Sequence, residues 1–304
     1  IEKRDERMKT EHLSNFRRTC LRLGARLYGA LRGESLDAED KMRPKKIRSF
    51  NTPLVEHCNL KCRGCDHFAP LAKPGFADLT TFEKDFVRLS ELLDGDVDRI
   101  GLMGGEPLLH PRIADFLPIA RKCFPKTRIR IVTNGVRLLK QKENFWRACA
   151  ESDIVIEVTK YPIRLNFEQM RNVCVSHGVT FEFREDTGEV EKTSYHIPLD
   201  LEGRQDIRKN FSKCFHANYT ISLREGKLYT CTAVPNIRHF NEYFHLNLPV
   251  TCQDSINIHQ ARNAQEIFEF LCQPIPFCRF CLVEKRTFGH PWQRSEKNIK
   301  EWTV

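Results

Sequence analysis

The chain has 304 residues, of which 40% are hydrophobic and 29% charged, a composition typical of a globular protein large enough for one or two domains. No apolar run approaches the roughly 18 residues of a membrane-spanning helix, and the charged opening IEKRDERMKTEHL is unlike a signal peptide, so we expect a cytoplasmic protein without a membrane span. The formal net charge is +9, yet the sequence carries no nucleic-acid-binding motif, so we expect no nucleic-acid partner.

Residues 1–47 are predicted to form a basic helical extension. Four leucines, Leu21, Leu23, Leu27 and Leu31, lie near helical spacing, and the segment GES ends the run. We favour a helix that packs on the main domain and turns its arginines to solvent. The alternatives are a helix on a membrane surface and a surface that binds an anionic partner.

Strands and helices are predicted to alternate from residue 48 to residue 210. The expected strands are NTPLVEH, RIGLM, RIRIVT, DIVIEV and VTFEFRE, and the expected helices are LTTFEKDFVRLSELLDG, IADFLPIARKCF, NFWRACAES and FEQMRNVCVSHG. Thr80 and Glu83 are expected to form a capping box at the first helix. Repeated βα units predict parallel strands. Five units are readable and we count a sixth, so the predicted fold class is α/β, an open sheet or barrel fragment, specifically a partial (β/α)6 TIM-like barrel.

Residues 211–304 are predicted to form a small C-terminal α+β domain and tail. ANYTISLREGKLYTC is expected to form a hairpin that turns at Glu225 and Gly226. A helix is expected near NAQEIFEFLC, followed by the cysteine-bearing segment PFCRFCLVEK.

Three cysteines, Cys58, Cys62 and Cys65, lie in the loop after the first predicted strand, on the side of a parallel sheet where active sites are usually built. Soft thiolates select zinc, copper or iron–sulfur clusters. A closed zinc site needs a fourth ligand, and His57 and His67 are too near along the chain to supply a convincing second pair. A [4Fe–4S] cluster held by three thiolates would keep one iron open for a substrate.

The spacing C-x3-C-x2-C at this place resembles the signature of radical S-adenosylmethionine (AdoMet) enzymes. Gly104-Gly105-Glu106-Pro107 after the second strand resembles that family's glycine–glycine–glutamate motif, and Thr133-Asn134-Gly135 ends the third strand at the same edge. The resemblance implies that Cys58, Cys62 and Cys65 hold a [4Fe–4S] cluster whose open iron binds AdoMet. It also implies reductive cleavage of AdoMet to a 5′-deoxyadenosyl radical, which abstracts a hydrogen atom from the substrate.

The resemblance also implies contacts with AdoMet. We assign them to Gly104, Gly105, Glu106 (as acceptor for the AdoMet ammonium), Asn134, His67 (near the adenine, with Phe68 as alternative) and Thr159 (near the ribose, with Lys160 and Arg184 as alternatives). For each residue at a strand end, an ordinary solvated side chain is the competing interpretation. The sequence departs from the family at Gly64, where the residue before the third cysteine is often aromatic.

A second set of cysteines lies in the C-terminal region. Cys214 and Cys231 flank Gly226 in a C-x11-G-x4-C pattern, which resembles the start of SPASM and twitch domains, and Cys278 and Cys281 resemble the closing pair of the shorter twitch form. The resemblance implies one auxiliary [4Fe–4S] cluster with four thiolates. A zinc site with the same four ligands is the alternative, and Cys252 or Cys272 are alternatives to Cys214. A free thiol at either position could also donate a hydrogen atom to a product radical, as in an epimerase.

We therefore predict a radical AdoMet enzyme that acts on a small polar, sugar- or aminocyclitol-like substrate, with oxidation or epimerisation as the outcome. The loop His67-Phe68-Ala69-Pro70-Leu71-Ala72 favours this, because it resembles radical AdoMet proteins associated with polysaccharide and small-molecule gene sets. The resemblance implies an electron donor such as flavodoxin or ferredoxin. The alternatives are a peptide-modifying enzyme that forms thioether or C–C cross-links, and a zinc-binding protein without catalysis. The sequence assigns no catalytic side chain.

Overall fold

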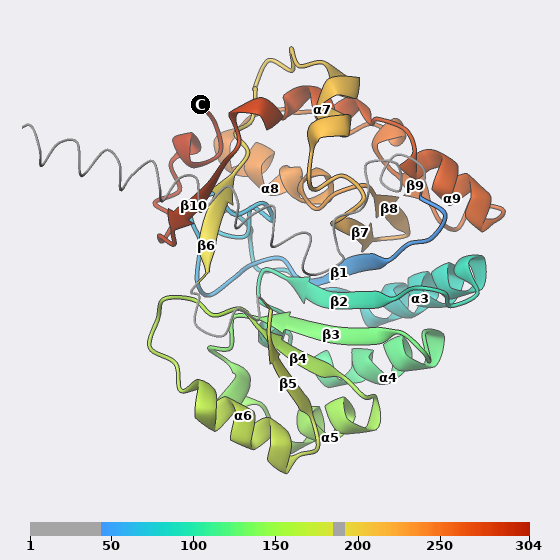
Figure 1. The fold of residues 1–304 in the computed structure, drawn as a ribbon, viewed down its shortest axis with the longest axis vertical. Coiled ribbons are helices and arrows are strands. Elements are labelled where there is room, and N and C mark those ends of the chain that lie inside the picture. The colour runs from blue at the N-terminus through green and yellow to red at the C-terminus, as the bar shows by residue number, and fades with distance from the viewer. Residues whose placement is uncertain (1–43, 185–191) are drawn as a thin grey trace, which may run out of the picture. The chain divides into compact units, whose positions relative to one another are not determined.

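An eight-stranded sheet forms the centre of the computed structural model (Figure 1), which describes residues 44–184 and 192–304. The strand order is β5-β4-β3-β2-β1-β7-β8-β9. The first five strands run parallel to one another; they are β1 (Ser49–Val55), β2 (Arg99–Gly104), β3 (Arg128–Thr133), β4 (Val155–Val158) and β5 (Thr180–Phe183). The predicted parallel α/β sheet is therefore confirmed.

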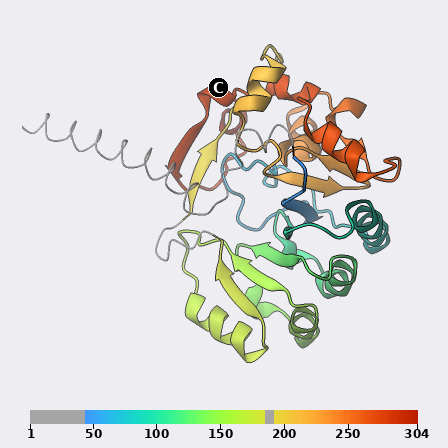
Figure 2. The ribbon, with the colours of Figure 1, turned by 45° about the vertical axis from the view of Figure 1, so that its right-hand side comes forward.

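Four helices connect these strands; they are α3 (Leu79–Leu93), α4 (Ile113–Cys123), α5 (Glu143–Glu151) and α6 (Phe167–Ser176). Figure 2 shows the helices α3, α4 and α5 in a row outside the strands, seen nearly end-on. Each helix carries the chain back to the end of the sheet at which the strands begin, so that successive strands run in the same direction, as in other βαβ connections. The carboxyl ends of β1 to β4 therefore meet at one edge, and the loops that follow them are neighbours.

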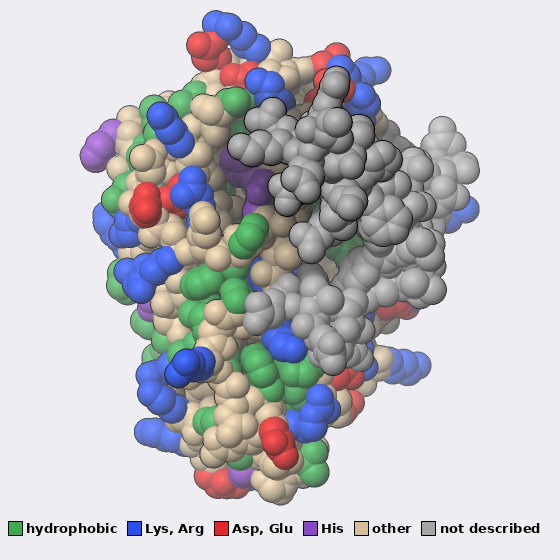
Figure 3. Space-filling view, turned by 60° about the vertical axis from the view of Figure 1, so that its left-hand side comes forward, with side chains coloured by type: hydrophobic (Ala, Val, Ile, Leu, Met, Phe, Trp, Pro, Cys, Tyr) green, Lys and Arg blue, Asp and Glu red, His purple; other side chains and the backbone are tan. Residues whose placement is uncertain are grey.

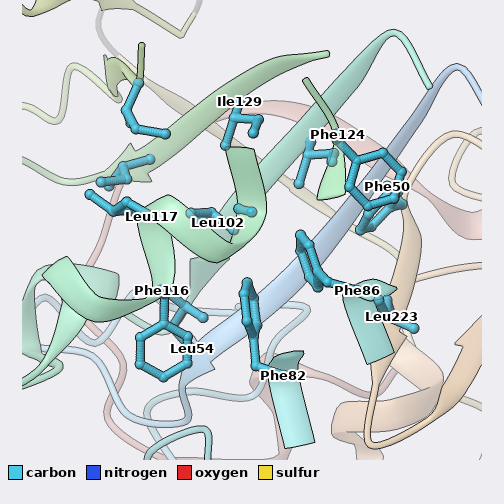
Figure 4. Packing of buried hydrophobic residues seen from close by; sticks show 14 of the residues in the cluster. Phe50, Leu54, Phe82, Phe86, Leu102, Phe116, Leu117, Phe124, Ile129 and Leu223 are labelled. Carbon is cyan, nitrogen blue, oxygen red and sulfur yellow. The ribbon is translucent and has the colours of Figure 1, made fainter. Parts of the chain in front are cut away.

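The main hydrophobic core lies between this sheet and its helices. Phe50, Phe86 and Phe124 pack edge to face with ring centroids 5.7–5.8 Å apart, and Figure 4 shows them beside Phe82 and Phe116. Phe50, Phe86 and Phe124 are fully buried. Burial of an aromatic side chain contributes about 1.5–3 kcal/mol each, so this core fixes the strands whose ends carry the polar loops.

The C-terminal half extends the same sheet. The strand β7 (Ile221–Arg224) pairs parallel to β1, while β8 (Lys227–Tyr229) and β9 (Ile256–Asn257) pair antiparallel. The predicted hairpin is confirmed, since Glu225 and Gly226 form its turn with φ of 49° and 73°. The described residues, 44–184 and 192–304, belong to one compact unit. The helices of this half are α7 (Ile207–Lys213), α8 (Ala233–Phe244) and α9 (Ala264–Leu271).

A second, two-stranded sheet pairs β6 (Thr193–His196) with β10 (Thr287–Pro291) in antiparallel orientation. The strand β6 is where a sixth βα unit would begin, but it does not join the main sheet in the described part of the chain. Instead β7 occupies the free edge of β1. The sequence could not reveal this pairing, because β10 lies about ninety residues away in a segment without a strand pattern.

The structure also decides how the first helix of the sheet region begins. The predicted capping box of Thr80 and Glu83 is wrong, since Asp78 is the N-cap of α3 and its side chain accepts from Thr81 N at 2.8 Å. Asp78 is the better acceptor because its charge also complements the helix dipole.

The predicted N-terminal helix lies outside the described residues. Among the helices that the structure describes, none is long and apolar enough to cross a membrane.

Candidate functional site

The loop with Cys58, Cys62 and Cys65 follows β1 at the carboxyl edge of the sheet, as the sequence predicts. Burial raises the pKa of the Cys58 thiol to about 12, and Glu106 and Cys62 nearby add to that shift. Burial also raises the pKa of Cys65, and the charges of Asp66, Cys62 and Cys58 act in the same direction. The three sulfur atoms are thus electrostatic neighbours in a poorly solvated place, where a metal would displace their protons.

The donor set of this loop suits an iron–sulfur cluster. Among the described residues, no three His, Cys, Asp or Glu side chains converge closely enough to hold one metal ion. The thiolates of a [4Fe–4S] cluster bind different irons and stand further apart. All three donors are soft sulfur ligands, as such a cluster requires.

The glycines of Gly104-Gly105-Glu106 bring the end of β2 against the end of β1. Gly104 has φ of +129°, and a Cβ on it would lie 2.3 Å from Val55 O. A Cβ on Gly105 would lie 2.0 Å from His57 O. Gly105 N donates to Val55 O at 2.7 Å, and Glu106 N donates to His57 O at 3.1 Å. These glycines are therefore required by the approach of two protein backbones, and they fix the residue that precedes Cys58.

The Glu106 carboxylate, the predicted acceptor for the AdoMet ammonium, is held by groups of the protein itself. The side chain is 0% exposed and accepts from Leu108 N at 3.1 Å, Thr133 Oγ1 at 2.5 Å and Asn134 N at 2.8 Å. Burial raises its pKa to about 7, although these three hydrogen bonds act in the opposite direction. The carboxylate thus ties the end of β2 to the end of β3, and its contact with AdoMet stays a prediction.

Asn134 lies where the sequence predicts, against the cysteine loop. Its Nδ2 donates to Asn59 Oδ1 at 2.8 Å and lies 3.7 Å from Cys58 Sγ. Thr159 is on the same edge, since its backbone N donates to Thr133 O at 2.9 Å. The structure therefore brings the loops after β1, β2, β3 and β4 together at one edge, as the candidate site requires.

His67 lies within a group of polar side chains next to Cys65. The Tyr195 hydroxyl donates to Asp66 Oδ2 at 2.6 Å, and the Tyr195 ring lies 5.1 Å from that of His216. Burial lowers the pKa of His67, while the charge of Asp66 opposes that shift. Burial would raise the pKa of Asp66, but His67, His216 and the Tyr195 hydrogen bond lower it to about 2. Sequence reasoning named His67 alone; Asp66, Tyr195 and His216 were missed.

The C-terminal tail, for which the sequence suggests no role, lies along the cysteine loop. Trp292 Nε1 donates to Cys62 Sγ at 3.1 Å, and Trp302 Nε1 donates to Cys65 O at 2.9 Å. Gly64 has φ of +62°, and a Cβ on it would lie 3.1 Å from Glu301 O. The tail thus packs against the position where the family often has an aromatic residue. No local pattern could find these contacts, which span more than 200 residues.

The four cysteines of the second set also lie together. Burial raises the pKa of Cys281, and the charges of Cys214, Cys231 and Cys278 add to the shift. Burial likewise raises the pKa of Cys231, with Cys214 and Cys278 as its neighbouring charges. Cys214 is thus a member of this group, whereas Cys252, the alternative, is an exposed residue of a separate 3-10 turn (Cys252–Asp254).

A buried ionic group joins the two halves of the site. Glu56, two residues before Cys58, accepts from Arg224 Nη2 on β7 and from His239 Nε2 on α8, the latter at 2.6 Å. Burial would raise the pKa of Glu56, but the His239 hydrogen bond and the Arg224 charge lower it to about 2.

On the face drawn in Figure 3, Lys and Arg side chains are spread with Asp and Glu side chains among them, so the excess of basic residues does not form a separate patch on that face.

Comparison with known proteins agrees with this geometry. Residues 52–159 match the model of the Radical SAM superfamily. The chain is 31% identical over 116 residues to molybdenum cofactor biosynthesis protein 1 of Bos taurus, covering 38% of this chain and 18% of that protein. It is 29% identical over 90 residues to GTP 3',8-cyclase of Campylobacter fetus subsp. fetus, covering 30% and 28%.

A solved structure of BtrN in complex with AdoMet and 2-DOIA is similar at a TM-score of 0.45 and 15% identity, covering 78% of this chain and 93% of that one. The matches to the two curated relatives span less than a third of either protein. The segment matched by the family model, residues 52–159, holds the three-cysteine loop and both glycine-containing turns. Residues 52–159 therefore form a radical SAM superfamily domain.

Proposed function

We propose that the chain is a radical AdoMet enzyme whose cluster is held by Cys58, Cys62 and Cys65. One observation carries the proposal: the three thiols, the close backbone contact at Gly104 and Gly105, and Asn134 lie together at the carboxyl ends of parallel strands. All of them belong to the segment that the family model matches. When bound, such a cluster supplies an electron for the cleavage of AdoMet and so the radical that abstracts a hydrogen atom. A flavodoxin or ferredoxin would be the electron donor.

The residues of this chain have separate tasks in that reaction. The three cysteines supply soft ligands and leave one corner of a cluster without a protein ligand. Glu106 holds the loops after β2 and β3 at a fixed separation through its three hydrogen bonds. Asn134 restrains the loop through Asn59. His67 and Thr159 are proposed to lie near the adenine and the ribose of AdoMet.

We propose that the second set of cysteines holds an auxiliary [4Fe–4S] cluster. Cys214, Cys231, Cys278 and Cys281 supply four thiolates, so a cluster there has a protein ligand at each corner. In this proposal residues 48–210 are the core domain, a barrel fragment with five parallel strands, and residues 211–304 are a twitch-type domain with the tail. The mutual shifts of the thiol pKa values support this assignment.

We propose a small polar substrate such as a sugar or an aminocyclitol, with oxidation or epimerisation as the outcome. The support is the polar group next to Cys65, in which Asp66, Tyr195 and His216 present a carboxylate, a hydroxyl and an imidazole. Such groups bind hydroxyl and amino substituents by hydrogen bonds.

The first test is anaerobic reconstitution with iron and sulfide, followed by assay of both. About eight irons per chain, four for each cluster, are expected. Zinc without sulfide would instead support a zinc-binding protein without catalysis. With dithionite and AdoMet, the reconstituted protein is expected to produce 5′-deoxyadenosine.

The substrate is tested by transfer of deuterium. Deuterated sugars, aminocyclitols and peptides are incubated separately with the enzyme, AdoMet and reductant, and the 5′-deoxyadenosine is examined by mass spectrometry. Deuterium from a sugar or aminocyclitol supports the proposal. Deuterium from a peptide alone would replace it with a peptide-modifying enzyme.

A further inference from the structure

Two aromatic side chains that carry hydrogen-bond donors lie beside Cys62, and one of them donates to its sulfur. The indole Nε1 of Trp292 lies 3.1 Å from Cys62 Sγ. Tyr161, three residues after β4, lies close to the same cysteine: burial raises the pKa of its hydroxyl, and the charge of Cys62 adds to that shift. The two rings are edge to face, with centroids 6.0 Å apart and an interplanar angle of 75°. Cys62 is therefore contacted from the core domain and from the tail at once.

The backbone of the tail holds Trp292 in this place. Arg63 N donates to Gln293 O at 2.9 Å, and Ser295 N donates to Lys61 O at 2.7 Å. These two bonds flank an antiparallel bridge between Cys62 and Arg294. The preceding residues form β10, which pairs with β6. Because the chain is fixed on both sides of Cys62, the indole is directed at the sulfur by secondary structure and does not reach it by chance rotation.

Donors aimed at a ligating sulfur change the chemistry of a cluster. A reduced iron–sulfur cluster carries one more negative charge than the oxidised cluster, and part of that charge lies on the sulfur atoms. An N–H or O–H donor stabilises the more negative state more strongly, so it raises the reduction potential. Such bonds gain strength where water is excluded, and Trp292 and Tyr161 are both partly buried.

We propose that Trp292, together with Tyr161, is a positioning residue that sets the reduction potential of the cluster held by Cys58, Cys62 and Cys65. The proposal rests on the proposed function, since it requires that a cluster is bound there. The tail is then a part of the cluster site. Trp302 provides the contrast, because its indole donates to the backbone oxygen of Cys65 and makes no bond to a sulfur.

The test is an anaerobic redox titration of the reconstituted full-length chain. The midpoint reduction potential is measured from the EPR signal of the reduced cluster. The signal that changes when AdoMet is added belongs to the AdoMet-binding cluster. Trp292→Phe keeps a ring and removes the donor, and its midpoint is expected to be more negative than that of the wild type. Tyr161→Phe is expected to shift it in the same direction. Trp302→Phe is the matched control, with an unchanged midpoint.

The outcomes separate this inference from the proposed function. A wild-type chain that takes up no iron and sulfide contradicts the proposed function itself. If the wild type holds its cluster, an unchanged midpoint in Trp292→Phe overturns the inference, as does an equal shift in Trp302→Phe. Trp292→His restores a ring N–H and is expected to return the midpoint towards the wild-type value. If Trp292→Phe takes up no cluster, Tyr161→Phe decides, and an unchanged midpoint in that variant overturns the inference.

Discussion

The two sets of cysteines are built in opposite ways. Cys58, Cys62 and Cys65 lie in a single loop after β1, and neighbouring strand ends brace that loop. The second set is drawn from three distant segments: Cys214 caps α7, Cys231 follows β8, and Cys278 and Cys281 belong to the turn Pro276–Phe280 and its end. The first set therefore depends on the local spacing of the sequence, and the second depends on the tertiary fold.

The number of thiols differs as well. Three thiols leave one corner of a four-iron cluster without a protein ligand, whereas four thiols leave none. On the proposed function, the first set is the place where AdoMet binds and the second set is closed. Variants of single cysteines are expected to separate these two tasks.

The largest effect is expected for Cys62→Ala. It removes the central thiolate of the first set, and two thiolates are too few to hold a cluster with an open corner. Production of 5′-deoxyadenosine with dithionite is expected to fall to background, and the iron content to fall by about half, as one of two clusters is lost. Cys252→Ala, which changes an exposed cysteine, is the control and should keep both. Undiminished cleavage in Cys62→Ala would contradict the assignment of the first set.

Cys278→Ala is expected to have the converse effect. It removes one of four thiolates from the second set, so about four irons per chain should be lost while the AdoMet-binding cluster is kept. Uncoupled cleavage of AdoMet should continue, and turnover of substrate should stop. The measurement is iron and sulfide content beside 5′-deoxyadenosine. Wild-type iron content in this variant would mean that the second set holds no cluster.

A smaller effect is expected at Glu106, which braces the first set. Its pKa is raised by burial from 4.5 to about 7. A raised pKa means that the folded state favours the neutral carboxyl, so this contribution to stability is full below pH 4.5 and is lost as the pH rises through 7. The loss amounts to about 3 kcal/mol, at 1.36 kcal/mol per pKa unit.

The variant Glu106→Gln cannot ionise and should lack this loss. It is measured by urea unfolding at several values from pH 5 to pH 8. The free energy of unfolding of the wild type should fall relative to the variant as the pH rises. At low pH the variant should be less stable by about 1–3 kcal/mol, because its amide NH₂ meets a backbone donor. Glu83→Gln on the exposed face of α3 should follow the wild type, and equal pH dependence in all three would refute the role of burial.

The sequence predicts the parallel sheet, four of its helices and the first cysteine loop, because these depend on local patterns. Alternating apolar segments fix β1 to β5, and Phe82, Phe86 and Leu89 mark the buried side of α3. The position of the cysteines after β1 follows from the order of elements alone. The hairpin at Glu225 and Gly226 is likewise local, since both residues adopt positive φ.

The parts that were missed are set by contacts between distant segments. The sequence did not show that the ends of β2 and β3 close around the Glu106 carboxylate and donate three hydrogen bonds to it. It gave the tail no role, although β10 pairs with β6 and both Trp292 and Trp302 contact the cysteine loop. The pairing of β10 with β6 involves exposed residues, so no hydrophobic alternation marked it.

The smallest expected effect tests whether the tail presses on the first cysteine loop at Gly64. Gly64→Ala places a side chain at φ of +62°, which costs about 1–2 kcal/mol, and its Cβ would also lie 3.1 Å from Glu301 O. Gly178→Ala is the matched control, because Gly178 has φ of +70° and nothing lies within 4 Å of the added Cβ. Urea unfolding should show a larger loss for Gly64→Ala, since the backbone of the tail must also shift. An equal loss of unfolding free energy in the two variants would mean that the tail can move away from the added Cβ without destabilising the protein. The contact with Glu301 O would then not be the reason for a glycine at position 64.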